Sequence, residues 1–303
     1  MTMADGGSSA DTVRRVAEGA ESGGQPQQGT WRGTEPPALP PLTAAQKLRG
    51  YLRLGAFILL TTVSILLFIA GRYLRHWLGH SVSFHFWVAR QWSRGGLWLA
   101  GLERQVEGTP VPGGALVANH CSWLDILSLR AVTLMYFVSK AEVSDWPGVG
   151  FVTRVTGTIF IERRRSQAKA QEAVLRSRIA ADQLLIFFPE GTSTDGQRVL
   201  PFKSSLFSVF FDEGRGADLL VQPVSIVYAP APGSELPAEF YGWWADMPFY
   251  GHILDVFARS RRGRVTVTFH PPARPADFSD RKALAEHCQQ SVAEGHRAVL
   301  AAS

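Results

Sequence analysis

A histidine and an aspartate lie five positions apart in the segment Ala115–Leu129, where a buried strand pattern turns into a helix pattern. His120 falls in the turn and Asp125 in the first helical turn, so the two side chains can meet if the chain bends between them. A carboxylate on one imidazole nitrogen fixes the tautomer and leaves the other nitrogen free as a general base. The alternative is structural, because Ser122 and Asp125 have the spacing of a capping box, in which Asp125 bonds only backbone.

A glutamate follows a second buried strand pattern. The run Leu184–Phe188 is followed by Pro189, Glu190, Gly191 and Thr192, which predicts a tight turn that presents Glu190 and backbone N–H groups at the same sheet edge. An ordinary strand exit with exposed polar residues has the same pattern, so this segment alone is weak evidence for a site.

Three arginines end a third strand pattern, in the segment Gly157–Arg165. A guanidinium binds phosphate in a bidentate fashion, so Arg163 is a candidate clamp for a phosphate or a lipid headgroup. Arg164 and Arg165 are interpreted as a solvated face or a contact with anionic lipid. A plain surface role is the alternative for Arg163 as well.

Three further residues are weaker candidates. Lys203, at the head of an apolar helical pattern, could contact a ligand or extend along the surface with its charge in water. Pro223 lies at the start of or within a strand pattern, where its missing N–H suits an edge or a bulge. Cys121 beside His120 invites a thiol-nucleophile interpretation, but neighbouring side chains generally diverge and nothing in the sequence orients the pair.

Composition and charge limit the class of protein. The chain has 303 residues, 46% of them hydrophobic and 19% charged, with a net charge of +5. These values exclude a wholly disordered chain and fit a globular body with one or two membrane-seeking segments. Residues 1–50 hold five acids and five bases, so the whole excess of positive charge lies beyond residue 50. A basic surface formed by those residues can bind nucleic acid, anionic lipid or a phosphorylated substrate.

Cysteine usage and ligand spacing give two further expectations. The chain has two cysteines, Cys121 and Cys288, which cannot form a disulfide framework and indicate a chain that faces the cytosol. It has no H-E-x-x-H sequence and no cysteine cluster, so no metal site is expected.

The amino-terminal third divides into a tail and an apolar region. Residues 1–45 are rich in Gly, Ser, Gln and Pro, which predicts a disordered tail. In residues 46–102, the uncharged run Leu54–Gly71 would form a helix of about 27 Å, and Trp77–Leu102 mixes aromatic residues with bases, as the headgroup zone favours. We predict membrane-anchoring helices that either barely span or dip in and return. The alternative is a buried helical hairpin of a soluble core.

Residues 103–303 are predicted to form an α/β domain, because short apolar strand patterns alternate with helical ones. The fold class is therefore α/β, with a mostly parallel central sheet flanked by helices and preceded by the amino-terminal membrane-associated helical hairpin. The predicted strands are Gln105–Glu107, Ala115–Ala118, Tyr136–Val138, Thr158–Ile161, Leu184–Phe188, Val221–Val227 and Val265–Phe269. The predicted helices are Leu124–Thr133, Ser166–Ala181, Lys203–Phe211 and Arg281–Ala301.

Four segments in this order resemble the sequence blocks of the PlsC-type glycerolipid acyltransferase family. Its first block, N-H-x-x-x-x-D, is matched by Asn119, His120 and Asp125. The second resembles GTIFIERR, the third, F-P-E-G-T, matches Phe188–Thr192, and the fourth resembles VQPVSI around Pro223. The resemblance covers about residues 46–299 and includes the family's hydrophobic amino-terminal helices.

The resemblance implies acyl transfer from a thioester to a lysolipid hydroxyl without a covalent acyl-enzyme. His120 would be the general base and Asp125 would orient it, while Arg163 would hold the acceptor's phosphate. Glu190 and Gly191 would shape the acceptor site, and Asn119, Thr192, Lys203 and Pro223 are further candidate substrate-binding residues. The resemblance implies no cofactor, with acyl-CoA or acyl carrier protein thioester as co-substrate.

One position departs from the family pattern. Many members that use lysophosphatidic acid read F-P-E-G-T-R-S, and this chain has Ser193 in place of the arginine. The run Thr192–Phe207, followed by Trp243–His252, also resembles relatives that acylate lyso-ornithine lipid, which has no phosphate. The bases Arg163 and Lys203 favour 1-acylglycerol-3-phosphate, which is the first choice, with lyso-ornithine lipid as the alternative.

The expected setting is the inner (cytoplasmic) membrane, with the catalytic domain facing the cytosol, where membrane lipids and a lysolipid acceptor meet a soluble acyl donor. Two rival classes remain: a non-catalytic membrane lipid-binding protein, and a nucleic-acid-binding protein using Arg163–Arg165 and Arg259–Arg264. The presence of both His120 and Asp125 disfavours the first. The lack of any recognised nucleic-acid motif disfavours the second.

Overall fold

The computed structural model describes residues 31–78, 84–161, 168–181, 183–211 and 219–303. Within these residues, the centre is a seven-stranded sheet with the strand order β1-β7-β6-β2-β5-β3-β4. Neighbouring strands pair parallel, apart from the antiparallel pair β6 and β7. The predicted mostly parallel α/β sheet is confirmed. The strands are β1 (Leu102–Glu107), β2 (Ala115–Ala118), β3 (Tyr136–Lys140), β4 (Ile159–Ile161), β5 (Leu185–Phe187), β6 (Val221–Ala229) and β7 (Gly263–Phe269).

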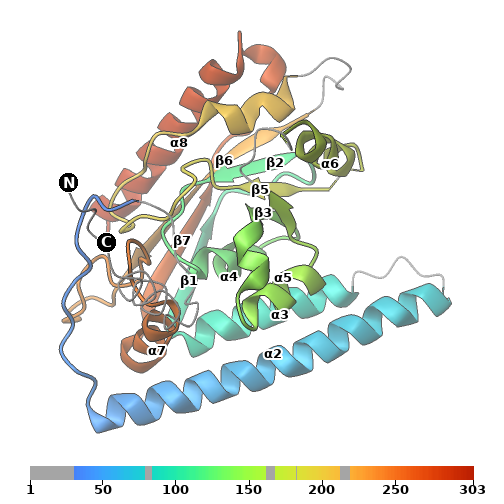
Figure 1. Cartoon of the computed structure of the whole chain (residues 1–303). Helices are drawn as coiled ribbons and strands as arrows, with labels where there is room; N and C mark the ends of the chain where they lie inside the picture. The colour runs from blue at the N-terminus through green and yellow to red at the C-terminus, as the bar shows by residue number, and fades with distance from the viewer. Residues whose placement is uncertain (1–30, 79–83, 162–167, 182, 212–218) are drawn as a thin grey trace, which may run out of the picture.

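Helices cover both faces of the sheet (Figure 1). On one face, α6, α8 and the 3₁₀ helix η3 bury residues such as Leu175, Phe207 and Cys288 against β2 and β5. On the other, α3, α4 and α7 bury residues such as Leu124 and Phe257. The helices are α2 (Ala44–Leu78), α3 (Phe84–Leu99), α4 (Leu124–Arg130), η1 (Ala141–Asp145), α5 (Val149–Val155), α6 (Ala168–Ala180), η3 (Ser204–Phe210), α7 (Phe249–Arg259), η4 (Pro275–Asp277) and α8 (Arg281–Ala301).

All seven predicted strands are present, with ends shifted by at most three residues. Of the predicted helices, Arg281–Ala301 is confirmed at both ends, while Leu124–Thr133 ends earlier, at Arg130. The segment predicted over Lys203–Phe211 is a 3₁₀ helix. The sequence interpretation missed α5, a helix of seven residues, and also α7, although its buried residues Phe249, Val256 and Phe257 follow a helical period.

The predicted tail and anchor have different boundaries in the structure. Residues 1–30 of the tail predicted over 1–45 lie outside the described residues, and residues 31–43 form an irregular segment. Helix α2 starts with a reciprocal cap: Thr43 N donates to Gln46 Oε1 at 2.8 Å, and Gln46 N donates to Thr43 Oγ1 at 3.2 Å. At 35 residues, α2 is longer than the predicted apolar run.

Helices α2 and α3 form a hairpin along one side of the domain (Figure 1). The Phe57 ring of α2 stacks on Trp92 of α3 with centroids 5.8 Å apart and lies 5.6 Å from Phe257 of α7. Trp92 Nε1 donates to Thr61 Oγ1 at 2.9 Å. Only 11% of the most apolar window of α2 is buried, so the hairpin is not the buried core element that the soluble alternative requires.

Pro223 lies inside β6, a central strand between β7 and β2. The sequence pattern suited either an edge or a bulge, and the structure shows the second. The Pro223 carbonyl accepts from His270 N at 3.0 Å, so its missing N–H also faces the β7 side. On that side, the hydrogen-bond pairing between β6 and the chain that continues from β7 is interrupted between the Val221–Ala273 bridge and the Val224–Phe269 pair. The chain from β7 has one extra residue in this interval, as in a β-bulge.

Candidate active site

The site lies where β2 and β5 end side by side. These strands are parallel and Val117 pairs with Phe187, so the residues that follow each strand meet at the same sheet edge. The imidazole of His120 stacks on the Phe188 ring with centroids 4.3 Å apart and an interplanar angle of 25°. The sheet thus joins the first and third sequence blocks.

Asp125 is fully buried and holds His120 through one carboxylate oxygen. Its Oδ2 lies 2.7 Å from His120 Nδ1 and accepts from Cys121 N at 2.9 Å and Ser122 N at 3.1 Å. The carboxylate binds backbone at the start of α4 and the imidazole at once, so the interpretation in which Asp125 bonds only backbone is wrong. This leaves His120 with Nδ1–H towards the carboxylate and Nε2 as the nitrogen that can accept a proton.

The turn that carries His120 is fixed from the sheet and from the next loop. Both ends of the Asn119 amide bond the β6 backbone: Nδ2 donates to Ile226 O at 2.9 Å and Oδ1 accepts from Ile226 N at 2.8 Å. Thr194 N donates to His120 O at 3.0 Å. The His120 side chain keeps 20% of its surface exposed, so the imidazole is held in place and remains accessible.

Asn119 and Pro223, which the sequence grouped with the substrate-binding residues, serve the scaffold in this structure. The Asn119 side chain is buried with both polar atoms bonded to β6. Pro223 is buried in the sheet opposite Val117. These two residues of the sequence blocks therefore join β2 to β6, and their side chains are not open to a ligand.

Glu190 lies beneath the turn with 2% of its surface exposed. Its Oε1 accepts from Leu200 N at 3.3 Å, and Oε2 has no hydrogen-bond partner among the described residues. Burial raises the pKa of Glu190 well above its ordinary value, although the backbone N–H groups of Leu200 and His120 oppose the shift. Burial of this kind favours the neutral form of a carboxyl over the ionised form.

Replacing Glu190 by glutamine should raise thermal stability, increasingly so at higher pH. The folded-state pKa of Glu190 is raised, so its contribution to stability is present below the unfolded pKa and is lost as pH rises through the folded pKa. Glutamine does not ionise, so the difference in melting temperature between the variant and wild type should grow from pH 5 upwards. Each kcal/mol of destabilisation that the substitution removes should raise the melting temperature by about 2–4 °C. Parallel melting curves for Glu190→Gln and wild type across pH would contradict this, and the exposed Glu286→Gln is the control.

Of the other predicted site residues, Gly191, Thr192 and Lys203 lie in or next to the turn that follows β5. Gly191 has a φ of 71°, a conformation that favours glycine, and closes the turn through Gly191 N to Phe188 O at 3.0 Å. Thr192 is half-buried in the same turn. Lys203 donates its backbone N–H to Pro189 O at 3.0 Å, but its side chain makes no hydrogen bond to the His120–Asp125 pair among the described residues. Arg163 lies outside the described residues.

Ser193, the position of the departure from the family pattern, is fully buried. Its Oγ donates to Trp243 O at 2.5 Å, in the segment before α7. The side chain therefore points into the protein and ties two loops together. It supplies no base to a ligand.

The structure adds an aromatic cluster that sequence reasoning did not assign to the site. Trp243 N donates to Cys121 O at 2.7 Å, which attaches the cluster to the catalytic turn. Phe249 lies 4.9 Å from Trp243, 5.3 Å from Trp146 and 6.4 Å from Trp123, measured between ring centroids. The signal available in the sequence was the density of aromatic residues in Trp243–Tyr250.

A buried histidine fixes Trp123 within this cluster. Trp123 Nε1 donates to His252 Nδ1 at 3.1 Å, and His252 Nε2 lies 3.2 Å from Phe240 O. Burial lowers the pKa of His252 to about 4, so the ring is neutral, with Nδ1 as acceptor and Nε2–H as donor. His252 is a structural histidine, in contrast to the accessible His120.

Cys121 does not have the environment of a nucleophile. The thiol is 1% exposed and its Sγ lies 3.7 Å from Asp125 Oδ1. Burial, and next the Asp125 charge, raise the pKa of Cys121 well above its ordinary value, so the reactive thiolate is suppressed.

Comparison with known proteins agrees with this geometry. Residues 104–227 match the family model described as Acyltransferase. A Rhodobacter capsulatus protein named lyso-ornithine lipid O-acyltransferase is 44% identical over 276 residues, which cover 88% of this chain and 96% of that relative. A Neisseria gonorrhoeae 1-acyl-sn-glycerol-3-phosphate acyltransferase is 33% identical over 210 residues, or 67% of this chain and 77% of the relative.

A solved structure shares the fold. The crystal structure of the 1-acyl-sn-glycerophosphate acyltransferase PlsC from Thermotoga maritima superimposes with a TM-score of 0.60 at 21% identity, over 84% of this chain and 98% of that chain. Together with the near-complete coverage of the Rhodobacter relative, the chain belongs to the PlsC-type O-acyltransferase family. The resemblance read from the four sequence blocks is confirmed.

Proposed function

We propose that this enzyme transfers an acyl chain from an acyl thioester to the hydroxyl of lyso-ornithine lipid. The observation that carries the mechanism is the 2.7 Å contact between His120 Nδ1 and the buried Asp125 carboxylate, beside an accessible imidazole face. The acceptor is inferred from the 44% identity to a relative of that name over nearly its whole length, and from Ser193.

The proposed chemistry needs only this pair. His120 Nε2 takes the proton of the acceptor hydroxyl while the oxygen attacks the thioester carbonyl carbon. The tetrahedral intermediate expels the thiolate, the C–S bond breaks, and the leaving sulfur receives the proton from the imidazolium. Asp125 stabilises that imidazolium throughout because its Oδ2 accepts from Nδ1–H. Glu190, buried beneath the turn, is proposed to shape the acceptor site rather than to take part in proton transfer.

Ser193 favours an acceptor without phosphate. Ser193 stands where many enzymes that use lysophosphatidic acid carry an arginine, and its side chain points towards Trp243 O. The site therefore lacks that positive charge. Each charge-assisted bond to phosphate contributes about 1.5–3 kcal/mol, and its loss weakens a phosphomonoester acceptor by tenfold or more. The second candidate is 1-acylglycerol-3-phosphate, supported by the Neisseria relative.

The exposed apolar face of α2 associates the protein with a membrane. Within the described residues, α2 is the helix long and apolar enough to cross one, and its outward face carries Leu52, Leu59 and Leu66. Its opposite face packs on α7 near Gly50 and on α3 as far as Gly71. Because one face of α2 rests on the domain while the other is apolar and exposed, we propose a monotopic enzyme on the cytosolic face of the inner membrane.

An acceptor panel tests the proposal with detergent-solubilised full-length protein, acyl-CoA or acyl carrier protein thioester, and purified lysolipids. We expect kcat/KM for lyso-ornithine lipid to exceed that for 1-acylglycerol-3-phosphate by about tenfold or more, the value of one lost phosphate contact. The reverse preference would establish the second candidate. Absence of transfer to every lysolipid with both donors would leave the non-catalytic lipid-binding class.

A further inference from the structure

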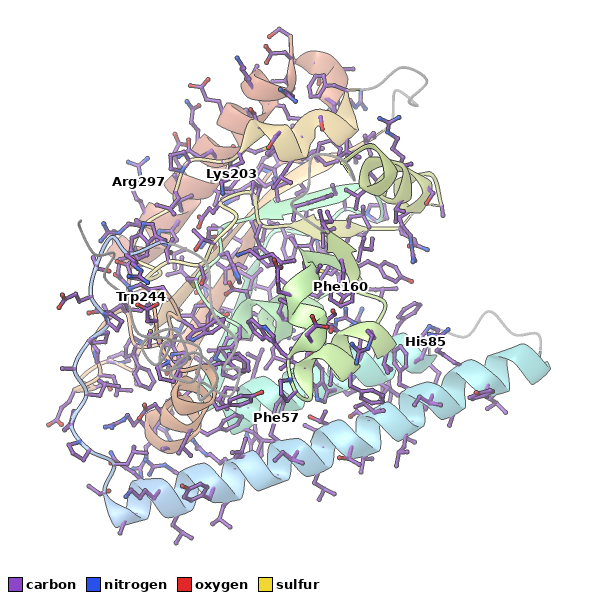
Figure 2. All side chains as sticks on the ribbon, in the orientation of Figure 1. Phe57, His85, Phe160, Lys203, Trp244 and Arg297 are labelled. Atoms are coloured by element: carbon purple, nitrogen blue, oxygen red, sulfur yellow. The ribbon has the colours of Figure 1, made fainter. Side chains whose placement is uncertain are left out.

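The irregular segment Trp31–Thr43 is docked along the side of the domain before α2 begins (blue in Figure 1). Trp244, labelled beside this segment in Figure 2, donates its Nε1–H to Thr34 O at 2.9 Å. Leu39 packs against the main core, and the Arg259 guanidinium donates to Pro40 O. The segment is therefore held by side chains from three distant parts of the chain.

One contact of this segment reaches the loop that follows Ser193. Thr34 Oγ1 donates to Asp195 Oδ2 at 3.1 Å, and the Asp195 side chain is only 4% exposed. Arg198 Nη2 lies 3.0 Å from the same oxygen, and Gln197 N donates to Oδ1 at 3.0 Å. The Trp31 ring lies under the Arg198 guanidinium at 5.5 Å. Asp195 thus closes residues 194–198 into a compact loop and binds that loop to the amino-terminal segment.

The 194–198 loop lies directly on the turn that carries His120. Thr194 N donates to His120 O at 3.0 Å. Gly196, with a φ of 74°, lies next to Cys121, since a Cβ added there would be in ordinary van der Waals contact with Cys121 Sγ at 3.5 Å. On its other side, His296 of α8 contacts Gly196 O at 3.0 Å. A displacement of this loop would therefore be transmitted to the base and would uncover Cys121.

We propose that Thr34 and Asp195 are positioning residues for the acyl transfer, acting through the 194–198 loop on His120. Small misplacements of a base cost large factors in rate, and Thr34 reaches this loop from outside the matched region 104–227. The kinetic part of this inference rests on the proposed function. Its structural part, protection of the turn by the amino-terminal segment, does not.

Kinetics of two conservative variants test the first part. Thr34→Val removes the O–H donor and keeps the backbone carbonyl that Trp244 binds, while Asp195→Asn keeps the shape and removes the charge. We expect kcat to fall about fivefold for Thr34→Val and about tenfold for Asp195→Asn, with KM nearly unchanged. Arg32→Ala is the matched control, because Arg32 in the same segment makes only an exposed pair with Asp246 and should leave both constants at wild-type values.

Thiol labelling tests the second part without any catalysis. The chain has two cysteines, both buried: Cys121 lies under the 194–198 loop, and Cys288 lies in the core beneath α8. With iodoacetamide and mass spectrometry of each peptide, we expect Thr34→Val and Asp195→Asn to label Cys121 about fivefold faster than wild type, with Cys288 unchanged.

Wild-type protection of Cys121 in both variants would overturn the proposal. So would a parallel rise at Cys121 and Cys288, because that is the result of global destabilisation. If the wild-type enzyme transfers no acyl chain to any lysolipid, the proposed function fails, while selective labelling of Cys121 still decides whether the amino-terminal segment holds the catalytic turn.

Discussion

Replacement of His120 by alanine should lower kcat for acyl transfer by about 10²- to 10⁴-fold, the usual contribution of a positioned general base. The imidazole is the one group of the turn that combines a fixed tautomer with an exposed surface, through Asp125 Oδ2 at 2.7 Å and 20% side-chain exposure. KM should change little, since the ring acts on the reacting hydroxyl rather than on the acyl chain or headgroup.

The measurement is initial-rate kinetics in detergent with the preferred lysolipid, alongside a melting curve for each protein. His287→Ala, on the exposed face of α8, is the control and should behave as wild type. A folded His120→Ala enzyme with wild-type kcat would exclude the mechanism.

Asp125→Asn should lower kcat by about 10³-fold or more while the fold survives, as expected when an orienting carboxylate loses its charge. Cys121 N and Ser122 N both point at Oδ2, so the asparagine oxygen should occupy that place and keep the turn intact. His120 would then donate to a neutral oxygen, and the imidazolium formed during transfer would lose its counter-charge.

A matched control exists in α8, where Asp280 caps the helix by accepting from Lys282 N and Ala283 N. Asp280→Asn changes the same chemistry at a helix start without a histidine partner, and asparagine caps about as well as aspartate. Its kcat should equal that of wild type. Equal losses in the two variants would show that capping, rather than orientation of His120, accounts for the effect of Asp125.

Local patterns predicted much of this fold because they depend on neighbours in sequence. Most strands were recognisable as short apolar runs, and the long helix α8 by its ends. Strand β1, with the mostly polar sequence LERQVE, was predicted only over its last three residues. The His120 and Asp125 pairing was predictable because both residues belong to one strand–turn–helix unit. Short or irregular elements carry little periodic signal, which is why α5 was missed and why η3 was predicted as an ordinary helix. Helix α7 was missed although its buried residues follow a helical period.

The sequence by itself determined the class of protein, the sheet, and the pairing of His120 with Asp125. Only the tertiary structure decided what long-range partners do: Asn119 bonds Ile226 across 107 positions, and Thr34 bonds Asp195 across 161. It also turned Ser193 inward to Trp243 O and buried Glu190, which raises the pKa of that carboxyl. The physical reason is that desolvation and hydrogen-bond geometry depend on which segments the sheet order brings together, and no local spacing records that order.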